Sequence, residues 1–217
     1  MRLVPCLLLW IALPAARLDA QAGARVRDLG PGRFLVASRG LLDPNFARSV
    51  VLLIQYNEDG AMGLVINRPT KLPLSRVLDG LKDAKGRSDP VYMGGPVAIT
   101  AVLALLRSRD GVEEGQRVLA GVYMISSKAS LEKALAARTE SSALRAYLGY
   151  SGWAAGQLEQ EVELGSWWIL RADADTVFDP DPATVWPRLI QRTEARIARR
   201  RDINTKDESE SSSAELR

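Results

Sequence analysis

The chain has 217 residues, 47% hydrophobic and 25% charged, and its 29 lysines and arginines against 26 aspartates and glutamates give a formal net charge of +3. It has no histidine and one cysteine, which excludes a Ser-His-Asp triad, a Cys-His pair, an HExxH zinc site and an intramolecular disulfide. The length fits one domain with accessory ends, and the net charge is weaker than that of a dedicated nucleic-acid-binding protein.

The first 22 residues have the layout of a secretory signal peptide. One arginine precedes an apolar stretch over residues 3–16, and Ala20-Gln21-Ala22 forms an A-x-A cleavage pattern. The stretch is shorter than the roughly 20 residues that a membrane-spanning helix needs. We therefore expect residues 1–22 to be removed on export to the periplasm or the medium, with no membrane span in the remainder. A cytoplasmic protein is the alternative.

Short runs of β-branched and apolar residues predict strands in the first half of the chain. The first two runs occupy residues 33–38 and 49–56. A third run, residues 61–67, follows the polar turn Asn57-Glu58-Asp59-Gly60, so we expect the second and third strands to form a β-hairpin. Residues 74–81 carry apolar side chains at helical spacing and predict a short helix.

The centre of the chain predicts strands separated by sharp turns. Residues 90–97 predict a strand that enters a corner at Gly94-Gly95-Pro96, where two conformationally free residues precede one with a fixed φ. The continuous apolar run 99–106 favours a buried strand over a helical turn, and residues 116–126 predict one further strand.

Helix signals follow this central region. Ser127 or Ser130 can cap a helix, and a second short helix is predicted over residues 141–148, with a short helix or turn over residues 156–162. Residues 166–171 predict a last strand, in which the two adjacent tryptophans point to opposite faces. Because strands and helices follow no regular βαβ rhythm, the pattern indicates an α+β domain, which we place at residues 23–198.

The chain ends in a predicted amphipathic helix and a charged tail. Asp181 and Pro182 open the helix, which Pro187 is expected to kink or restart. An apolar stripe consists of Trp186, Leu189, Ile190, Thr193 and Ile197, and a neighbouring basic face of Arg188, Arg192, Arg196 and Arg199. Residues 199–217 have few apolar side chains and predict a disordered tail. We expect nucleic-acid binding to be at most weak and non-specific.

No catalytic signature is complete. Gly149-Tyr150-Ser151-Gly152-Trp153 lacks the last glycine of a nucleophile elbow, and Ser130-Leu131-Glu132-Lys133 lacks the companion motifs of an S-x-x-K enzyme. The aspartates between residues 173 and 181 form no calcium-binding loop, and the sequence has no glycine-rich phosphate loop. These patterns predict no catalytic residue, no metal site and no cofactor.

Two glycine-rich strand ends and one aromatic segment suggest a ligand-binding edge. The edge would combine three contributions. The amide and guanidinium at one strand end supply hydrogen-bond donors, the Gly-Gly corner supplies exposed N–H groups, and the aromatic segment supplies an apolar wall. The candidate ligand-binding residues are Asn67, Arg68, Gly94, Gly95, Gly152, Trp153 and Gln157. The alternative is that the glycines serve tight turns and Trp153 packs in the core.

Three long segments resemble the AlgH/YqgE family of bacterial proteins. They are residues 32–70, beginning GRFLVAS and ending AMGLVINRPT; residues 91–97, VYMGGPV; and residues 148–168, beginning LGYSGWAAGQ. The resemblance implies a compact fold with a bifurcated, barrel-like sheet and peripheral helices. It implies little about activity, since the family is uncharacterised and often carries the label of a transcriptional regulator. This chain departs from the family at Arg39, usually proline, and over residues 100–105, where a histidine is usual.

Three functions compete on these observations. The first is a noncatalytic binding or regulatory module that recognises an unknown small ligand or protein at the predicted edge. The second is a transcriptional regulator with weak nucleic-acid binding, although the sequence has no helix-turn-helix pattern. The third is a hydrolase that works without His or Cys, and its test is whether a carboxylate or a lysine lies within hydrogen-bond reach of Ser130 or Ser151.

Overall fold

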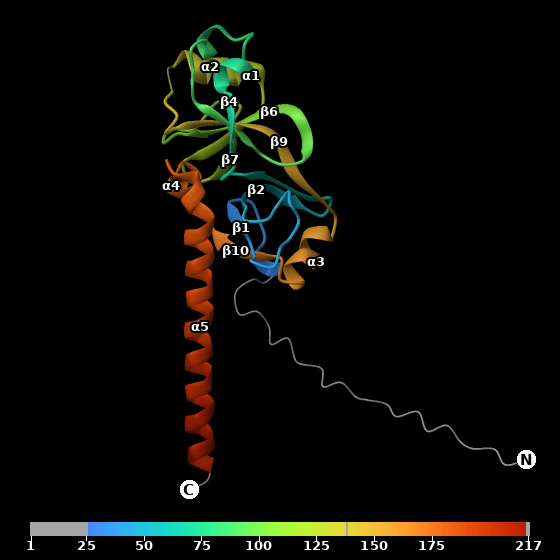
Figure 1. Ribbon diagram of the computed structural model, residues 1–217, viewed down its shortest axis with the longest axis vertical. Coiled ribbons are helices and arrows are strands. Elements are labelled where there is room, and N and C mark those ends of the chain that lie inside the picture. The colour runs from blue at the N-terminus through green and yellow to red at the C-terminus, as the bar shows by residue number, and fades with distance from the viewer. Residues whose placement is uncertain (1–25, 138, 216–217) are drawn as a thin grey trace, which may run out of the picture.

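The computed structural model describes residues 26–137 and 139–215 and shows an α+β domain from which one long helix extends (Figure 1). The predicted signal peptide, residues 1–22, lies outside the described residues. Ten strands form a curled half-barrel sheet, and helices α1 to α5 lie around it. The predicted α+β class and the single compact domain are confirmed.

The sheet runs in the order β10-β1-β2-β3-β9-β6-β8-β7, with β4 paired to β5 and β5 to β9. Every pairing is antiparallel except that of β5 with β9. The strands are β1 (Arg33–Ala37), β2 (Val50–Asn57), β3 (Gly60–Val65), β4 (Pro69–Pro73), β5 (Pro90–Met93), β6 (Val97–Arg107), β7 (Gln116–Leu119), β8 (Val122–Ile125), β9 (Leu144–Ala154) and β10 (Trp167–Arg171). The long strand β9 bifurcates the sheet, because its end pairs with β3 and its earlier part with β5 and β6.

Helices cover the two ends of this sheet. They are α1 (Leu74–Val77), α2 (Lys128–Ala136), α3 (Gln157–Glu163), α4 (Ala174–Val177) and α5 (Pro182–Glu215), with short 3-10 turns η1 (Val26–Asp28) and η2 (Lys82–Ala84). The larger core cluster fills the space among β1, β2, β3, β10, α3 and the start of α5. A smaller cluster packs α1 and α2 against β6, β8 and β9.

Three sequence predictions were wrong in the centre of the chain. Residues 141–148, predicted as a helix, contain the start of β9, because Leu144 to Tyr147 are buried between β5 and β6 and tertiary pairing outweighs a helical spacing of apolar residues. Residues 116–126 form a hairpin of β7 and β8 rather than one strand, with Gly121 at a φ of 74° in the turn. The helix predicted over 74–81 stops at Val77.

The other strand predictions and the predicted hairpin are confirmed. The run 99–106 lies within β6, and the second and third strands form the hairpin of β2 and β3. Ser127 caps α2, its side chain accepting a hydrogen bond from the Ser130 N–H. Trp167 is fully buried whereas Trp168 is only partly buried, as alternation along one strand predicts.

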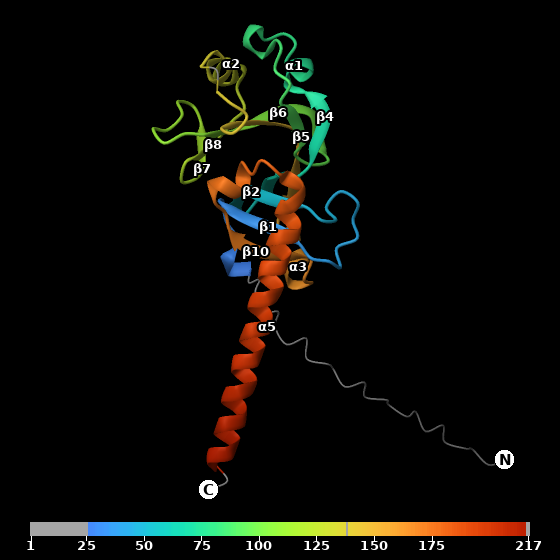
Figure 2. The ribbon, with the colours of Figure 1, turned by 60° about the vertical axis from the view of Figure 1, so that its left-hand side comes forward.

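Helix α5 packs its predicted apolar stripe on the domain and then extends away from it (Figure 2). Trp186, Leu189, Ile190 and Thr193 are buried, and Trp186 Nε1 donates a 2.8 Å hydrogen bond to the Ala37 carbonyl. The helix does not restart at Pro187. Proline has no N–H to donate to the carbonyl of Ala183, one turn earlier, but both residues are exposed, so this carbonyl can bind water instead.

Helical structure continues to Glu215, over most of the segment for which the sequence predicts a disordered tail. The far half of α5 projects beyond the sheet in both views, with no core beside it (Figures 1 and 2). A helix without tertiary packing is marginal in water, so disorder of residues 199–217 in solution stays a prediction.

Candidate functional site

The first two residues of the predicted ligand-binding edge hold a loop in place. Asn67 accepts a 2.8 Å hydrogen bond from the Val50 N–H and donates one of 3.0 Å to the Arg48 carbonyl. The Arg68 guanidinium donates to the carbonyls of Asn45 and Ala47, and its partial burial lowers the pKa of this group below its ordinary value. Both side chains therefore fix residues 45–50 against the segment that follows β3.

The Gly-Gly corner allows two backbones to cross in contact. A Cβ atom on Gly95 would lie 2.2 Å from the Tyr150 carbonyl carbon, and one on Gly94 would lie 2.3 Å from the Gly149 carbonyl oxygen. The Gly94 N–H donates to the Leu148 carbonyl, and the Gly94 carbonyl accepts from the Val65 N–H. These glycines are needed for close packing between the corner and β9.

The aromatic part of the predicted edge lies in the core. Trp153 is 5% exposed, stacks on Phe46 with ring centroids 5.8 Å apart, and donates through Nε1 to Glu161. The same carboxylate accepts a 2.8 Å hydrogen bond from Trp167 Nε1 and one from Gln157. Trp153 and Gln157 thus join β9, α3 and β10, and of the predicted set Gly152 and Gln157 are exposed at the surface.

The structure therefore brings the three predicted segments together but uses their polar groups internally. The ends of β3, β5 and β9 meet as expected. The hydrogen bonds of Asn67, Arg68, Trp153 and Gln157 go to partners within the protein. Ligand binding at this edge stays a prediction.

The two serines named in the hydrolase hypothesis differ in their surroundings. Ser151 is fully buried and donates a hydrogen bond to the Gly94 carbonyl. Ser130 Oγ donates a 3.3 Å hydrogen bond to a Glu114 carboxylate oxygen and accepts one of 2.7 Å from Ser127, the residue that caps α2. A carboxylate thus lies within hydrogen-bond reach of Ser130, as the hydrolase hypothesis requires, and hydrolysis stays a prediction. Lys133, the S-x-x-K lysine, instead pairs with Glu113 at 2.5 Å. The S-x-x-K pair is thus not formed, and Ser130 serves the helix cap.

A basic pocket of about 630 Å³ lies where the two ends of the sheet approach each other. The backbone of β7 packs on the start of β1, and a Cβ atom on Gly32 would lie 2.9 Å from the Val118 carbonyl oxygen. We call this cavity the seam pocket. Its lining residues come from before and within β1, from β7 and its turn, and from the end of β10 to α4: Pro31, Gly32, Arg33, Arg117, Val118, Leu119, Ala120, Arg171, Ala172, Asp173 and Ala174.

Three arginines dominate the chemistry of the seam pocket. Arg33 and Arg171 are direct cross-strand partners in β1 and β10, so their side chains emerge from the same face, and Arg117 comes from β7, which also lines the pocket. Among the described side chains, none of the three has a carboxylate within 4.0 Å or a side-chain hydrogen bond. Like charges placed directly opposite on paired strands repel each other. Arginines therefore outnumber carboxylates in the lining of the seam pocket, which is positively charged.

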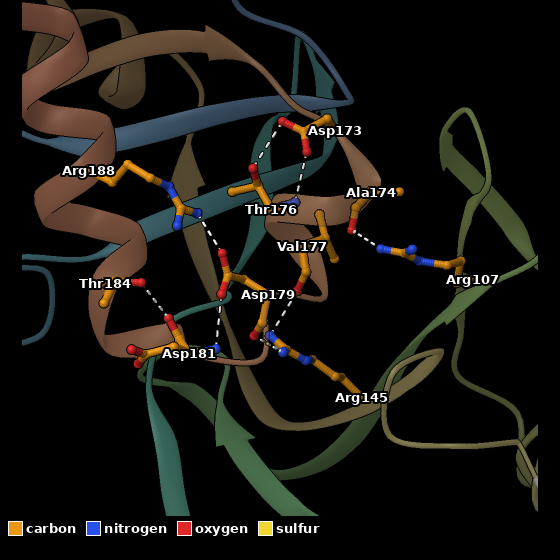
Figure 3. Close-up of polar contacts among 10 residues, drawn as sticks. All are labelled: Arg107, Arg145, Asp173, Ala174, Thr176, Val177, Asp179, Asp181, Thr184 and Arg188. Carbon is orange, nitrogen blue, oxygen red and sulfur yellow. Dashed lines mark hydrogen bonds and ion pairs between the residues drawn. The ribbon is translucent and has the colours of Figure 1, made fainter.

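The part of the lining formed by Asp173 and Ala174 is held in place by residues outside the seam pocket (Figure 3). Asp173 caps α4, accepting hydrogen bonds from the N–H and the hydroxyl of Thr176. The neighbouring Ala174 carbonyl accepts a 2.7 Å hydrogen bond from Arg107, which reaches it from β6. The wall is therefore formed before any ligand binds.

The connection from α4 to α5 continues this network. Arg145, 6% exposed, donates to the carbonyls of Val177 and Asp179, and Arg188 of α5 pairs with the Asp179 carboxylate at 2.6 Å (Figure 3). Burial raises the pKa of Asp179, but hydrogen bonds from Arg188 and the Asp181 N–H outweigh it, and the net pKa is below the ordinary value. The segment that bounds the pocket is thus tied to β6, β9 and α5.

Sequence reasoning missed the seam pocket because its arginines are far apart in the chain. Each stands at the end of an apolar run or beside it, where a charged residue is ordinary. A faint signal exists, since Arg33 opens β1 and Arg171 closes β10, the two ends that antiparallel pairing brings together. That pairing was not readable before the sheet order was known.

A family model described as AlgH-like matches residues 34–198, which is most of the chain and all of its sheet except Arg33. The chain belongs to the AlgH-like family. The resemblance carried by the three sequence segments is confirmed.

Curated relatives share the greater part of their length with this AlgH-like chain. A UPF0301 protein of Streptomyces avermitilis is 37% identical over 173 residues, covering 77% of this chain and 88% of that protein. One from Thioalkalivibrio sulfidiphilus is 40% identical over 163 residues, covering 74% and 87%. These names state a family and no activity.

Solved structures show the same fold. The AlgH protein from Pseudomonas aeruginosa is 36% identical, with a TM-score of 0.59 over 77% of this chain and 87% of that one. A protein from Corynebacterium diphtheriae is 26% identical, with a TM-score of 0.65 over 76% and 87%. Within residues 26–137 and 139–215, no helix has the length and apolarity to cross a membrane.

Proposed function

We propose that this AlgH-like protein is a noncatalytic binding module that holds a small anion in the seam pocket. The observation that carries the proposal is the cross-strand pair Arg33 and Arg171, which lines the pocket together with Arg117 and has no carboxylate partner among the described side chains. Guanidinium groups bind phosphate and carboxylate through paired N–H donors. An anion between them would replace repulsion by charge-assisted hydrogen bonds.

The shape of the seam pocket supports the same proposal. Its volume of about 630 Å³ lies within the range of small-molecule sites. The wall at Ala174 is fixed by Arg107, so little ordering is needed when a ligand binds. The lining has one carboxylate, that of Asp173, against three arginines, so the pocket keeps a positive balance of charge.

The experiment compares thermal stability with and without inorganic phosphate at constant ionic strength, using sodium chloride as the reference salt. We expect phosphate to raise the melting temperature of the wild type, as any ligand of the native state does. Arg33→Gln and Arg171→Gln should lose this rise. Without phosphate each should be as stable as the wild type or a few tenths of a kcal/mol more stable, because one of two like charges is gone.

Arg76→Gln is the matched control, since Arg76 is an exposed arginine on α1 that is not among the residues lining the seam pocket. It should keep the full response to phosphate. The proposal fails if phosphate stabilises the wild type no more than chloride does, or if both pocket variants respond as the wild type does.

A further inference from the structure

We infer that the ligand of the seam pocket is a small anion with at least two phosphoryl groups and no nucleobase. This inference rests on the proposed function and specifies the ligand class. It follows from how the three arginines are distributed over the pocket, from which side chains are missing in its lining, and from where its one carboxylate lies.

The positive charges of the seam pocket come from a cross-strand pair and from a separate strand. Arg33 and Arg171 stand directly opposite each other in register, so their Cβ atoms lie about 5 Å apart and both guanidiniums can reach one phosphoryl group. Arg117 belongs to β7, which is paired with neither β1 nor β10. A single phosphate held by the cross-strand pair leaves Arg117 for a second negative group, so an anion with two linked phosphoryl groups uses all three arginines.

The rest of the lining offers nothing to a nucleobase. Apart from Asp173 and the arginines, the pocket is bounded by glycine, alanine, proline, valine and leucine, with no aromatic side chain among its described lining residues. Stacking of a base on an aromatic ring contributes about 1–3 kcal/mol in proteins that bind single-stranded nucleic acid. A nucleotide would therefore bind here through its phosphates alone.

The carboxylate of Asp173 sets the side on which the anion lies. It borders the pocket beside α4, and its two oxygens accept hydrogen bonds from Thr176. A phosphoryl group placed beside it would be repelled, so the favoured position lies between the Arg33–Arg171 pair and Arg117. A compact anion fits this arrangement, whereas a polymer with evenly spaced charges would pass close to Asp173.

The test is isothermal titration calorimetry of the full chain in a buffer free of divalent cations, with orthophosphate, pyrophosphate, ADP, adenosine and a single-stranded DNA oligonucleotide. We expect pyrophosphate to bind about tenfold or more tightly than orthophosphate, since it gains the charge-assisted bonds of Arg117. ADP should bind within about threefold of pyrophosphate, and adenosine should not bind, because the base finds no stacking partner.

The variant Arg117→Gln separates this inference from the proposed function. It should reduce pyrophosphate affinity to about the level of orthophosphate and reduce orthophosphate affinity by a clearly smaller factor. Arg76→Gln should leave both affinities unchanged. If no anion binds, the proposed function fails as well. If orthophosphate binds as tightly as pyrophosphate, if Arg117→Gln weakens both equally, or if ADP or DNA binds at these arginines more tightly than pyrophosphate, only the ligand class is overturned.

Discussion

The guanidinium of Arg145 lies under the connection between α4 and α5 and donates to two of its carbonyls, that of Val177 at 2.9 Å and that of Asp179. The same group lies 4.7 Å from the centroid of the Tyr92 ring, so a cation from β9 is enclosed between an aromatic face and backbone oxygens. One buried side chain thereby fixes the segment that bounds the seam pocket and starts the long helix.

Arg145→Met should destabilise the domain by about 2–4 kcal/mol, because two buried carbonyls lose their donors. Arg188→Met, which removes the half-exposed ion pair with Asp179, should cost less than about 1 kcal/mol. Urea unfolding of the two variants against the wild type measures both values. Equal losses would show that the buried hydrogen bonds of Arg145 do not stabilise the connection.

Gly95→Ala should cost about 2 kcal/mol or more, since its Cβ would overlap the backbone of Tyr150 and the φ of 156° is strained for any residue with a side chain. Gly80→Ala is the matched control, because a Cβ there meets nothing within 4 Å. It should change the free energy of unfolding by less than about 0.5 kcal/mol. Chemical denaturation of both variants tests this, and a tolerated Gly95→Ala would contradict the close crossing.

The hydroxyl of Tyr56 donates a 2.6 Å hydrogen bond to Glu159, and this bond, with burial adding to it, raises the pKa of Tyr56 from 10.0 to about 12. The folded protein therefore binds this proton more tightly than the unfolded chain does. The resulting stability is fully present below about pH 10 and is lost as the pH rises through about 12.

Tyr56→Phe should therefore lower stability at neutral pH and show a smaller loss above about pH 10 than the wild type. Ultraviolet titration should lack one late-ionising phenol in this variant. Tyr123→Phe, which removes a hydroxyl without a hydrogen bond among the described residues, is the control. An unchanged alkaline stability profile in Tyr56→Phe would refute the role of the Glu159 bond.

The arginine face of α5 predicts weak, salt-sensitive binding to polyanions. Arg188, Arg192, Arg196 and Arg199 are all exposed, as the helical spacing requires. We expect duplex DNA to bind no tighter than about 1 μM at physiological salt, without sequence preference, and with a salt slope of about 0.9 per phosphate contacted. Glutamine at Arg192, Arg196 and Arg199 should flatten this slope in a fluorescence anisotropy titration. Tight, sequence-specific binding that persists in high salt would instead favour a transcriptional regulator.

The sequence alone was enough for features that depend on neighbouring residues. The hairpin of β2 and β3 follows from a polar turn between two apolar runs, and the docking of α5 follows from the spacing of Trp186, Leu189 and Ile190. The family could be recognised for a similar reason, since its motifs are continuous segments. Export of residues 1–22 stays a prediction.

Only the tertiary structure decided the features that depend on strand order. Residues 144–148 satisfy a helical spacing, yet they form a central strand because β6 pairs with one edge of them and β5 with the other edge at Tyr147 and Leu148. The structure also decided that the polar groups of the candidate edge are not free. Asn67 and Trp153 form hydrogen bonds with residues of other strands and helices. The arginines at 33, 117 and 171 line one pocket because the curled sheet brings β7 against the residue that precedes β1. No local sequence pattern records a contact made by the curvature of a sheet.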